Sequence, residues 1–354
     1  MVLQIERWHR TCSFNTCNGT VDRPHEMRKI FVFAFSILAA TYAAATAASA
    51  ADSTLTPVSF TLNWMPTADH AGYFAAKAMH VYERYGLDVT ITPGGPQLNV
   101  YQLLAAGQTD MIMGTTMRTL NARLHGIPIV TVASWYQKDA TTFMLHPENK
   151  AQSLAELNHN PMYIPGISRG NYWPWLKAKF GYSDELLKPF DSGYRAWSLD
   201  PAAVAQGYIT IDHPTMVGVG VPNGRSLMLA DFGWTQYINT VETTETLISE
   251  KPDVLRNFLK ATAEGWRIYL ADPKATNEEL IRLNSQLDMP TLVEGYKMIK
   301  DNKLLDGGDA AAGKIGAISD KRMSAFVDEM VGAGVIAASP EYAKSYTLKF
   351  LDAL

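Results

Sequence analysis

The chain has 354 residues, a formal net charge of −4 and 19% charged residues, and it contains no block of basic side chains. A mildly acidic protein of this kind is a poor candidate for a nucleic-acid-binding protein. Both cysteines, Cys12 and Cys17, lie close to the start of the chain. The rest of the sequence therefore excludes disulfides, cysteine-ligated metals and thiol nucleophiles.

The first fifty residues have the features of a secretory signal. Two basic residues after Met27 precede an apolar run, and the segment ends in Ala-Ser-Ala at 48–50. This order predicts translation from Met27, cleavage after Ala50 and a periplasmic product. An uncleaved membrane anchor is the alternative, because residues 30–48 are about long enough to span a bilayer.

From residue 55 onward, short β-branched runs alternate with helical stretches, which is typical of an α/β fold with parallel sheets. A polar segment at 145–153 suits a crossing into a second lobe, and the chain is expected to return near 227–233. The sequence therefore predicts a discontinuous lobe 1 (residues 55–146 and 233–354) and a lobe 2 (residues 147–232). The predicted strands are 58–64, 87–91, 110–114, 127–135, 161–166 and 207–212. The predicted helices are one from Ala71, 100–106, 116–124, one after Asn171, one after Asp200 and one within 250–273.

Ligand contacts are expected where strands end and helices begin, because backbone N–H groups and short polar side chains collect there. Four such junctions are 63–73, 94–96, 114–118 and 166–173. The second, Gly-Gly-Pro, lacks the spacing of a phosphate-binding loop and predicts a tight turn. A cleft between the two lobes is the expected place for a small ligand.

The stretch NWMPTADH at 63–70 places an aromatic ring and an imidazole in one predicted loop. Trp64 is either a stacking surface or a core residue at the end of the strand. Asp69 is expected to cap the helix, which puts His70 in the first turn, where the helix dipole favours a neutral imidazole. A lone histidine is more often a structural group than a ligand contact, so both interpretations of His70 stay open.

The other candidates also have two interpretations. Thr115 and Thr116 are either ordinary helix caps or ligand contacts, and Arg169 is either a loop residue or an anion-binding guanidinium. The motifs of serine hydrolases, zinc proteases and nucleotide-binding loops are absent, and the histidines show no metal-ligand spacing. The sequence favours a binding protein without metal or cofactor over an enzyme.

An ordered series of segments carries a family likeness: LNWMPTADHAGYFAAK, YGLDVTITPGGP, LLAAGQTDMIMG, GIPIVTVAS, GYITID, LMLADFG and EKPDVLRNFLKATAEGW. The series resembles the periplasmic solute-binding proteins of the thiamine-pyrimidine group, within the nitrate, sulfonate and taurine-binding superfamily of ABC importers. The likeness runs from about residue 58 to about residue 273.

The resemblance implies a two-lobed type II periplasmic binding protein, the Venus flytrap fold, in which each lobe is a sheet flanked by helices and the chain crosses twice. It implies a monomer that captures a small-molecule ligand and delivers it to an inner-membrane permease and its ATPase. A planar heteroaromatic ligand is expected, such as a thiamine-precursor pyrimidine, and a flavin would satisfy the same features. A small anion such as nitrate or a sulfonate is the alternative.

Carried over by position, the resemblance implies that Trp64 stacks on the ligand and that His70 and Tyr73 contact its edge. Asp212, where relatives often have glutamate, would accept hydrogen bonds from an exocyclic amine. A second stacking ring would come from Trp135, Tyr172, Trp173 or Trp197. The expected ligand-binding residues are Asn63, Trp64, His70, Tyr73, Thr115, Thr116 and Trp135 from lobe 1, and Arg169, Gly170, Asn171 and Asp212 from lobe 2.

An enzymatic branch with the same fold is the alternative of a different class. The pyrimidine synthases of thiamine biosynthesis have a similar P-T-x-x-H motif, whose histidine is consumed as a reactant, and a cysteine-rich run for iron. The corresponding region here, 229–239, contains no cysteine. With the predicted signal peptide, this difference favours a solute-binding protein.

Overall fold

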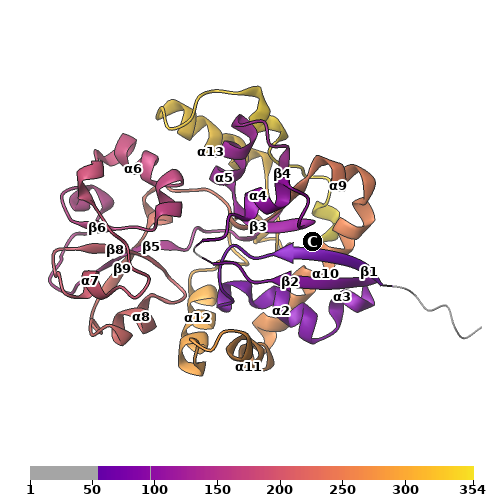
Figure 1. Cartoon of the computed structure of the whole chain (residues 1–354), viewed down its shortest axis with the longest axis horizontal. Coiled ribbons are helices and arrows are strands. Elements are labelled where there is room, and N and C mark those ends of the chain that lie inside the picture. The colour runs from indigo at the N-terminus through magenta and orange to yellow at the C-terminus, as the bar shows by residue number, and fades with distance from the viewer. Residues whose placement is uncertain (1–54, 96) are drawn as a thin grey trace, which may run out of the picture. The chain divides into compact units, whose positions relative to one another are not determined.

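The structure is a computed structural model that describes residues 55–95 and 97–354 (Figure 1). The predicted signal peptide and its cleavage site lie outside these residues. The described chain contains two five-stranded mixed sheets, each flanked by helices. This architecture confirms the predicted α/β class with two lobes, although neither sheet is purely parallel.

The sheet of lobe 1 has the strand order β2-β1-β3-β10-β4. Parallel pairs join β1 to β2 and to β3, whereas β10 runs antiparallel to both of its neighbours. The carboxyl ends of β1 and β3 therefore lie at the same edge of the sheet. The strands are β1 (Thr56–Thr61), β2 (Leu87–Thr92), β3 (Met111–Thr115), β4 (Ile129–Tyr136) and β10 (Ile238–Thr244).

The sheet of lobe 2 has the order β7-β6-β8-β5-β9, with parallel pairing of β6 to β7 and β8 and antiparallel pairing of β5 to β8 and β9. Its first strand precedes residue 147, the predicted start of lobe 2. The reason is that the run TTFML pairs with β8 and β9 rather than extending the sheet of lobe 1. The strands are β5 (Thr141–Leu145), β6 (Met162–Tyr163), β7 (Leu187–Lys188), β8 (Val204–Tyr208) and β9 (Arg225–Met228).

Helices cover both faces of the first sheet (Figure 1). On one face, Phe74 of α2 and Phe258 and Trp266 of α10 pack with Val58 and Phe60 of β1 in one buried cluster. The helices in chain order are α2 (Ala71–Ala78), α3 (Val81–Arg84), α4 (Val100–Ala105), α5 (Thr116–Leu124), α6 (Trp173–Phe180), α7 (Arg195–Ser198), α8 (Asp212–Gly218), α9 (Glu245–Glu250), α10 (Pro252–Ala271), α11 (Lys274–Leu283), α12 (Met289–Asp301) and α13 (Asp320–Gly332).

Two predictions about the later part of the chain were wrong. The predicted helix after Asp200 is a turn that leads into β8, and the short helix α7 precedes it. The predicted strand at 207–212 ends at Tyr208, and Asp212 begins α8 instead of ending a strand. These shifts change the surroundings of Asp212.

A buried carboxylate and a half-buried guanidinium join the two segments that cross between the sheets, 137–140 and 233–237. The Asp139 carboxylate accepts hydrogen bonds from Trp234 Nε1 (2.9 Å) and Gln236 Nε2 (2.7 Å). Arg322 of α13 donates to the carbonyl oxygens of Gln137 (2.7 Å) and Gln236 (3.1 Å). The crossing segments are therefore fixed side by side.

Candidate functional site

The loop after β1 carries the first candidate residues and lies against the turn after β2. Gly94 N–H donates to the carbonyl oxygen of Trp64 over 3.0 Å. A Cβ at Gly94 would lie 2.2 Å from the Leu62 carbonyl oxygen, so only glycine permits this approach. Asn63 and Trp64 are half-buried, which leaves part of the indole accessible. Pro96 of the predicted turn lies outside the described residues.

His70 is a buried, neutral imidazole whose Nε2 atom has no hydrogen-bond partner among the described residues. It ends a 3-10 turn, Ala68–His70, that leads directly into α2. The backbone N–H of Thr67 donates to His70 Nδ1 over 3.1 Å, which assigns the ring proton to Nε2. Burial lowers the pKa of His70 to about 3. The imidazole therefore offers one N–H donor at neutral pH.

Asp69 is not the helix cap that the sequence analysis expected. Its carboxylate accepts hydrogen bonds from the hydroxyls of Thr67 (2.9 Å), Tyr136 (2.8 Å) and Thr210 (2.8 and 2.9 Å). Burial raises its pKa, and these hydroxyl donors oppose that rise. Since Thr210 belongs to lobe 2, Asp69 joins the turn that carries His70 to the other lobe.

Thr115 and Thr116 lie at the end of β3, but only Thr115 has unused hydrogen-bonding capacity. The Thr116 hydroxyl donates to the carbonyl oxygen of Tyr237 (3.3 Å) and accepts from its N–H (3.2 Å). Thr115 Oγ1 is buried and has no partner among the described residues. Thr115 is therefore the better candidate for a ligand contact, and Thr116 has a structural role.

Asn239 is a candidate that no sequence pattern indicated. It lies at an irregularity of β10, next to Ile238, which pairs with Thr115, and its φ of 54° is left-handed. Its Nδ2 donates to the carbonyl oxygen of Asp69 (3.2 Å), and its Oδ1 accepts from the Tyr208 hydroxyl of lobe 2 (3.3 Å). Bulges and left-handed non-glycine residues concentrate at functional sites. Asn239 thus connects the His70 turn, the edge at Thr115 and lobe 2.

Arg169 and Gly170 are exposed, in a 3-10 segment of lobe 2 (Gly166–Gly170). The Gly170 carbonyl oxygen accepts from Asn121 Nδ2 of α5 over 3.3 Å, so this segment contacts lobe 1. Asn171 follows, and its buried Oδ1 has no partner in the described part of the chain. Asn171 joins His70 and Thr115 as a predicted contact with a buried, unpartnered polar atom.

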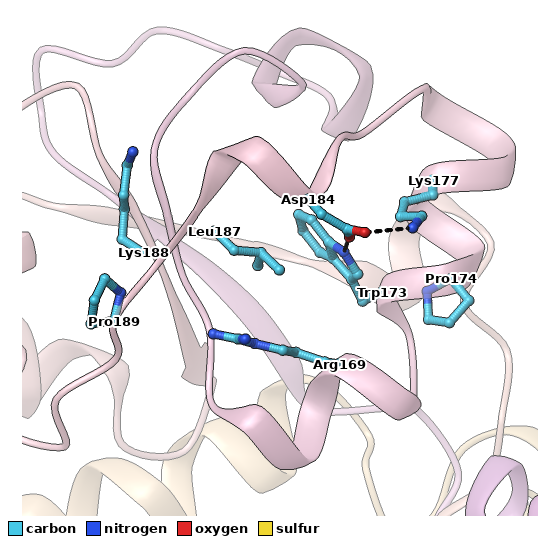
Figure 2. Close-up of a pocket in the computed structure, with 8 residues that line it drawn as sticks. All are labelled: Arg169, Trp173, Pro174, Lys177, Asp184, Leu187, Lys188 and Pro189. Carbon is cyan, nitrogen blue, oxygen red and sulfur yellow. Dashed lines mark hydrogen bonds and ion pairs between the residues drawn. The ribbon is translucent and has the colours of Figure 1, made fainter.

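Arg169 lines an open hollow of about 820 Å³ whose lining residues all belong to lobe 2. Figure 2 shows these side chains. Asp184 in this hollow accepts hydrogen bonds from Trp173 Nε1 (2.7 Å) and Lys177 Nζ (2.9 Å). Lys188 also lines it. The hollow presents three cationic side chains and one carboxylate, so its charge is mainly positive.

The predicted contacts of Tyr73 and Trp135 do not fit the structure, because both rings lie in the core of lobe 1. Trp135 Nε1 donates to the Tyr73 hydroxyl over 2.7 Å. The other proposed second rings, Tyr172, Trp173 and Trp197, are also buried. Among the proposed stacking rings, Trp64 alone retains partial exposure.

The Asp212 carboxylate likewise has its hydrogen-bond donors within lobe 2. Its Oδ2 accepts from the hydroxyls of Thr142 (2.6 Å) and Ser226 (2.5 Å), and its Oδ1 accepts from the Tyr208 N–H (2.6 Å). The carboxylate is buried at the start of α8. These three donors satisfy it without a ligand. The expected role in binding an exocyclic amine does not fit this placement.

Within 55–95 and 97–354, no group of three or more histidine, cysteine, aspartate or glutamate side chains is arranged to hold a metal ion. In the same part of the chain, no helix has the length and apolar character to cross a membrane.

Comparison with known sequences identifies a family and several relatives. The profile of the family described as NMT1/THI5 like matches residues 67–276. The riboflavin-binding protein RibY of Chloroflexus aurantiacus is 28% identical over 254 residues, covering 69% of this chain and 70% of RibY. The formylaminopyrimidine-binding protein of Halalkalibacterium halodurans is 24% identical over 251 residues, covering 69% of this chain and 75% of that protein.

Enzymes also occur among the relatives. The 4-amino-5-hydroxymethyl-2-methylpyrimidine phosphate synthase THI11 of Saccharomyces cerevisiae is 34% identical over 272 residues, covering 68% of this chain and 75% of the enzyme. Among solved structures, the periplasmic aliphatic sulphonate binding protein SsuA of Escherichia coli matches with a TM-score of 0.62 at 12% identity, covering 82% of this chain and 91% of SsuA. At that identity the likeness shows the fold alone, which is the periplasmic binding protein fold.

Proposed function

The chain belongs to the NMT1/THI5-like family, and from this membership we propose that it is the solute-binding component of an ABC importer. In this proposal it is a periplasmic monomer, secreted through a cleavable signal peptide, that captures a small planar heteroaromatic between its lobes and presents it to a permease and its ATPase. A thiamine-precursor pyrimidine is the proposed ligand, and a flavin is the next candidate.

The main support for the proposal is the buried ring N–H of His70. Its buried Nε2–H has no partner among the described residues, and a buried donor without a partner costs free energy. A heterocycle with an acceptor nitrogen or oxygen at its edge would satisfy that donor. Because the pKa of His70 is about 3, the imidazole is neutral throughout the neutral range, with Nδ1 accepting from Thr67 and the proton on Nε2.

Further support comes from the position of Trp64 and the chemistry of the relatives. The partly accessible indole lies in the same loop as His70, at the carboxyl edge of β1, where it would stack on a flat ring. The unpartnered Thr115 Oγ1 and Asn171 Oδ1 would bind the polar edge of that ring. Two relatives are named for binding riboflavin and formylaminopyrimidine, both of which contain flat heterocycles.

A small anion is a weaker candidate for the same site. The anion model depended on Arg169, whose side chain lines a hollow formed by lobe 2 alone. Aromatic side chains also support a planar ligand less strongly than the sequence suggested. The support now depends on Trp64 instead of several tryptophans, because the other rings are buried.

A pyrimidine-synthase-like enzyme is the second candidate, favoured by the 34% identity to the yeast enzyme. Its distinguishing sequence feature, a cysteine-rich run, is missing from 229–239. We therefore propose binding without turnover.

Calorimetric titration of the protein that begins at Ala51 tests the proposal. The compounds are formylaminopyrimidine, 4-amino-5-hydroxymethyl-2-methylpyrimidine, riboflavin, taurine and nitrate. Binding of one heteroaromatic per protein, with the compound recovered unchanged by chromatography, supports a solute-binding protein. Binding of taurine or nitrate alone contradicts the proposed ligand class, and conversion of a bound compound or of His70, detected by mass spectrometry, supports the enzyme.

A further inference from the structure

Two hydrogen-bonded routes connect lobe 2 to the turn that carries His70, and both end on Asp69. In the first, the Thr210 hydroxyl donates to the Asp69 carboxylate, 2.9 Å from Oδ1 and 2.8 Å from Oδ2. In the second, the Tyr208 hydroxyl donates to Asn239 Oδ1, and Asn239 Nδ2 donates to the Asp69 carbonyl oxygen. The segment 208–210 of lobe 2 is thus bonded to Asp69 through both side chain and backbone.

The Asp69 carboxylate collects donors from three separate parts of the fold. Thr67 belongs to the same turn, Tyr136 ends β4 where the chain leaves lobe 1, and Thr210 belongs to lobe 2. An ionised carboxylate only accepts hydrogen bonds, and it has about four positions for donors. Because Asp69 is buried, water does not replace a lost donor easily. The three hydroxyls therefore fix the carboxylate, and with it the turn, relative to both lobes.

Helix α12 packs against both sides of this junction. A Cβ at Gly295 would lie 2.9 Å from Ala68 Cβ and 3.0 Å from the Thr210 carbonyl oxygen. The helix thus touches the His70 turn and the 208–210 segment at the same point. Any rotation of lobe 2 that carries Thr210 away from Asp69 also changes this contact.

We propose that Asp69 is a positioning residue that links ligand contact at His70 to the angle between the lobes. The inference rests on the proposed function, in which His70 donates to the ligand. Asp69 and His70 are consecutive in one 3-10 turn, so a displacement of Asp69 moves the imidazole. By thermodynamic linkage, a ligand that binds to His70 stabilises the lobe arrangement in which Thr210 donates to Asp69. Loss of that hydrogen bond therefore lowers the affinity for the ligand.

Thr210→Val tests the link because it removes the hydroxyl and keeps the side-chain shape. Thr243→Val is the matched control. Its hydroxyl is also fully buried and donates over 2.7 Å to the Asp110 carbonyl oxygen, within lobe 1. Thr210→Ser restores a hydroxyl at the junction and should behave as the wild type.

The interlobe distance is measured by electron-electron double resonance on protein that begins at Ala51. Since the chain lacks cysteine after Cys17, Ala78→Cys in α2 and Glu185→Cys in lobe 2 give one exposed spin label in each lobe. Affinity for formylaminopyrimidine and riboflavin is measured on the unlabelled variants by calorimetry.

We expect Thr210→Val to broaden the ligand-free distance distribution and to weaken binding at least about fivefold, as for a typical coupling between sites. Thr243→Val and Thr210→Ser should match the wild type in both measurements. If Thr210→Val matches Thr243→Val in either distance or affinity, the link is refuted. If neither compound binds the wild type, the proposed function fails, while an unchanged distance distribution in Thr210→Val separately refutes the role of Asp69.

Discussion

The indole N–H of Trp135 donates a 2.7 Å hydrogen bond to the hydroxyl of Tyr73, and both rings are fully buried in the core of lobe 1. Their planes are 83° apart, in an edge-on arrangement. The pair stabilises the packing of α2 on β4, so neither ring is available to a ligand.

We predict that Trp135→Phe destabilises the protein and leaves ligand affinity unchanged. The substitution removes the donor to a buried hydroxyl, which costs about 1–3 kcal/mol, in addition to lost packing. Urea unfolding and calorimetric titration measure the two effects. Weakened binding at unchanged stability would instead place Trp135 on the ligand surface.

Trp64→Ala should have the opposite effect. The residue is half-buried in a loop, so removal of its ring should cost little stability. Loss of stacking should weaken the binding of a heteroaromatic ligand by about 1–3 kcal/mol. Trp197→Ala is the matched control, because that ring is fully buried in lobe 2 and its loss should cost about 3–5 kcal/mol of stability. The site model is wrong if Trp64→Ala unfolds like Trp197→Ala and binds like the wild type.

His70→Asn should change how stability depends on pH in the acid range. The pKa of His70 is about 3 in the folded protein and ordinarily 6.5. Below pH 6.5 the unfolded chain binds a proton that the folded chain does not, so stability decreases toward pH 3 by up to about 1.4 kcal/mol per pH unit. Asparagine keeps an acceptor for the Thr67 N–H and does not titrate. Urea unfolding from pH 7 to pH 4 should therefore give a shallower decline for His70→Asn, and parallel curves would show that His70 is accessible to protons.

Glu242 should make stability depend on pH with the opposite sign. It is buried in the central strand β10, and burial raises its pKa from 4.5 to about 7, opposed by the Thr119 and Thr240 hydroxyls. The folded state therefore binds the proton more tightly, and stability is lost as the pH rises from 4.5 to 7. Between pH 5 and pH 8, the wild type should lose about 2–3 kcal/mol relative to Glu242→Gln. Equal pH profiles in urea unfolding of the two proteins would contradict a buried, protonated Glu242.

The sequence predicted elements well where local chemistry determines them. Helix α5 spans 116–124 as expected, and α10 begins at Pro252 and buries Phe258 and Trp266 on one stripe. Strand β10 escaped prediction because its buried residues Thr240, Glu242 and Thr243 are polar and give no apolar run. Their burial follows from pairing between β3 and β4, a tertiary relationship that no local pattern contains.

The candidate site was predicted less completely for the same reason. The motif around Trp64 and His70 located the loop, and the helix-entrance pattern located Thr115. However, an aromatic residue near a strand end can face either the core or the surface, and Tyr73 and Trp135 face the core. Asn239 was missed because its role depends on an irregularity in a strand that was itself missed.

¹⁵N NMR of histidine-labelled protein, titrated with the heteroaromatic that binds in calorimetry, shows directly whether His70 contacts the ligand. The His70 resonances are assigned by their absence in His70→Asn. We predict a neutral ring protonated at Nε2 at pH 7, whose Nε2 resonance shifts as the ligand saturates the site. A His70 spectrum that does not change at saturating ligand would contradict the proposed contact, because the ligand would then bind without this donor.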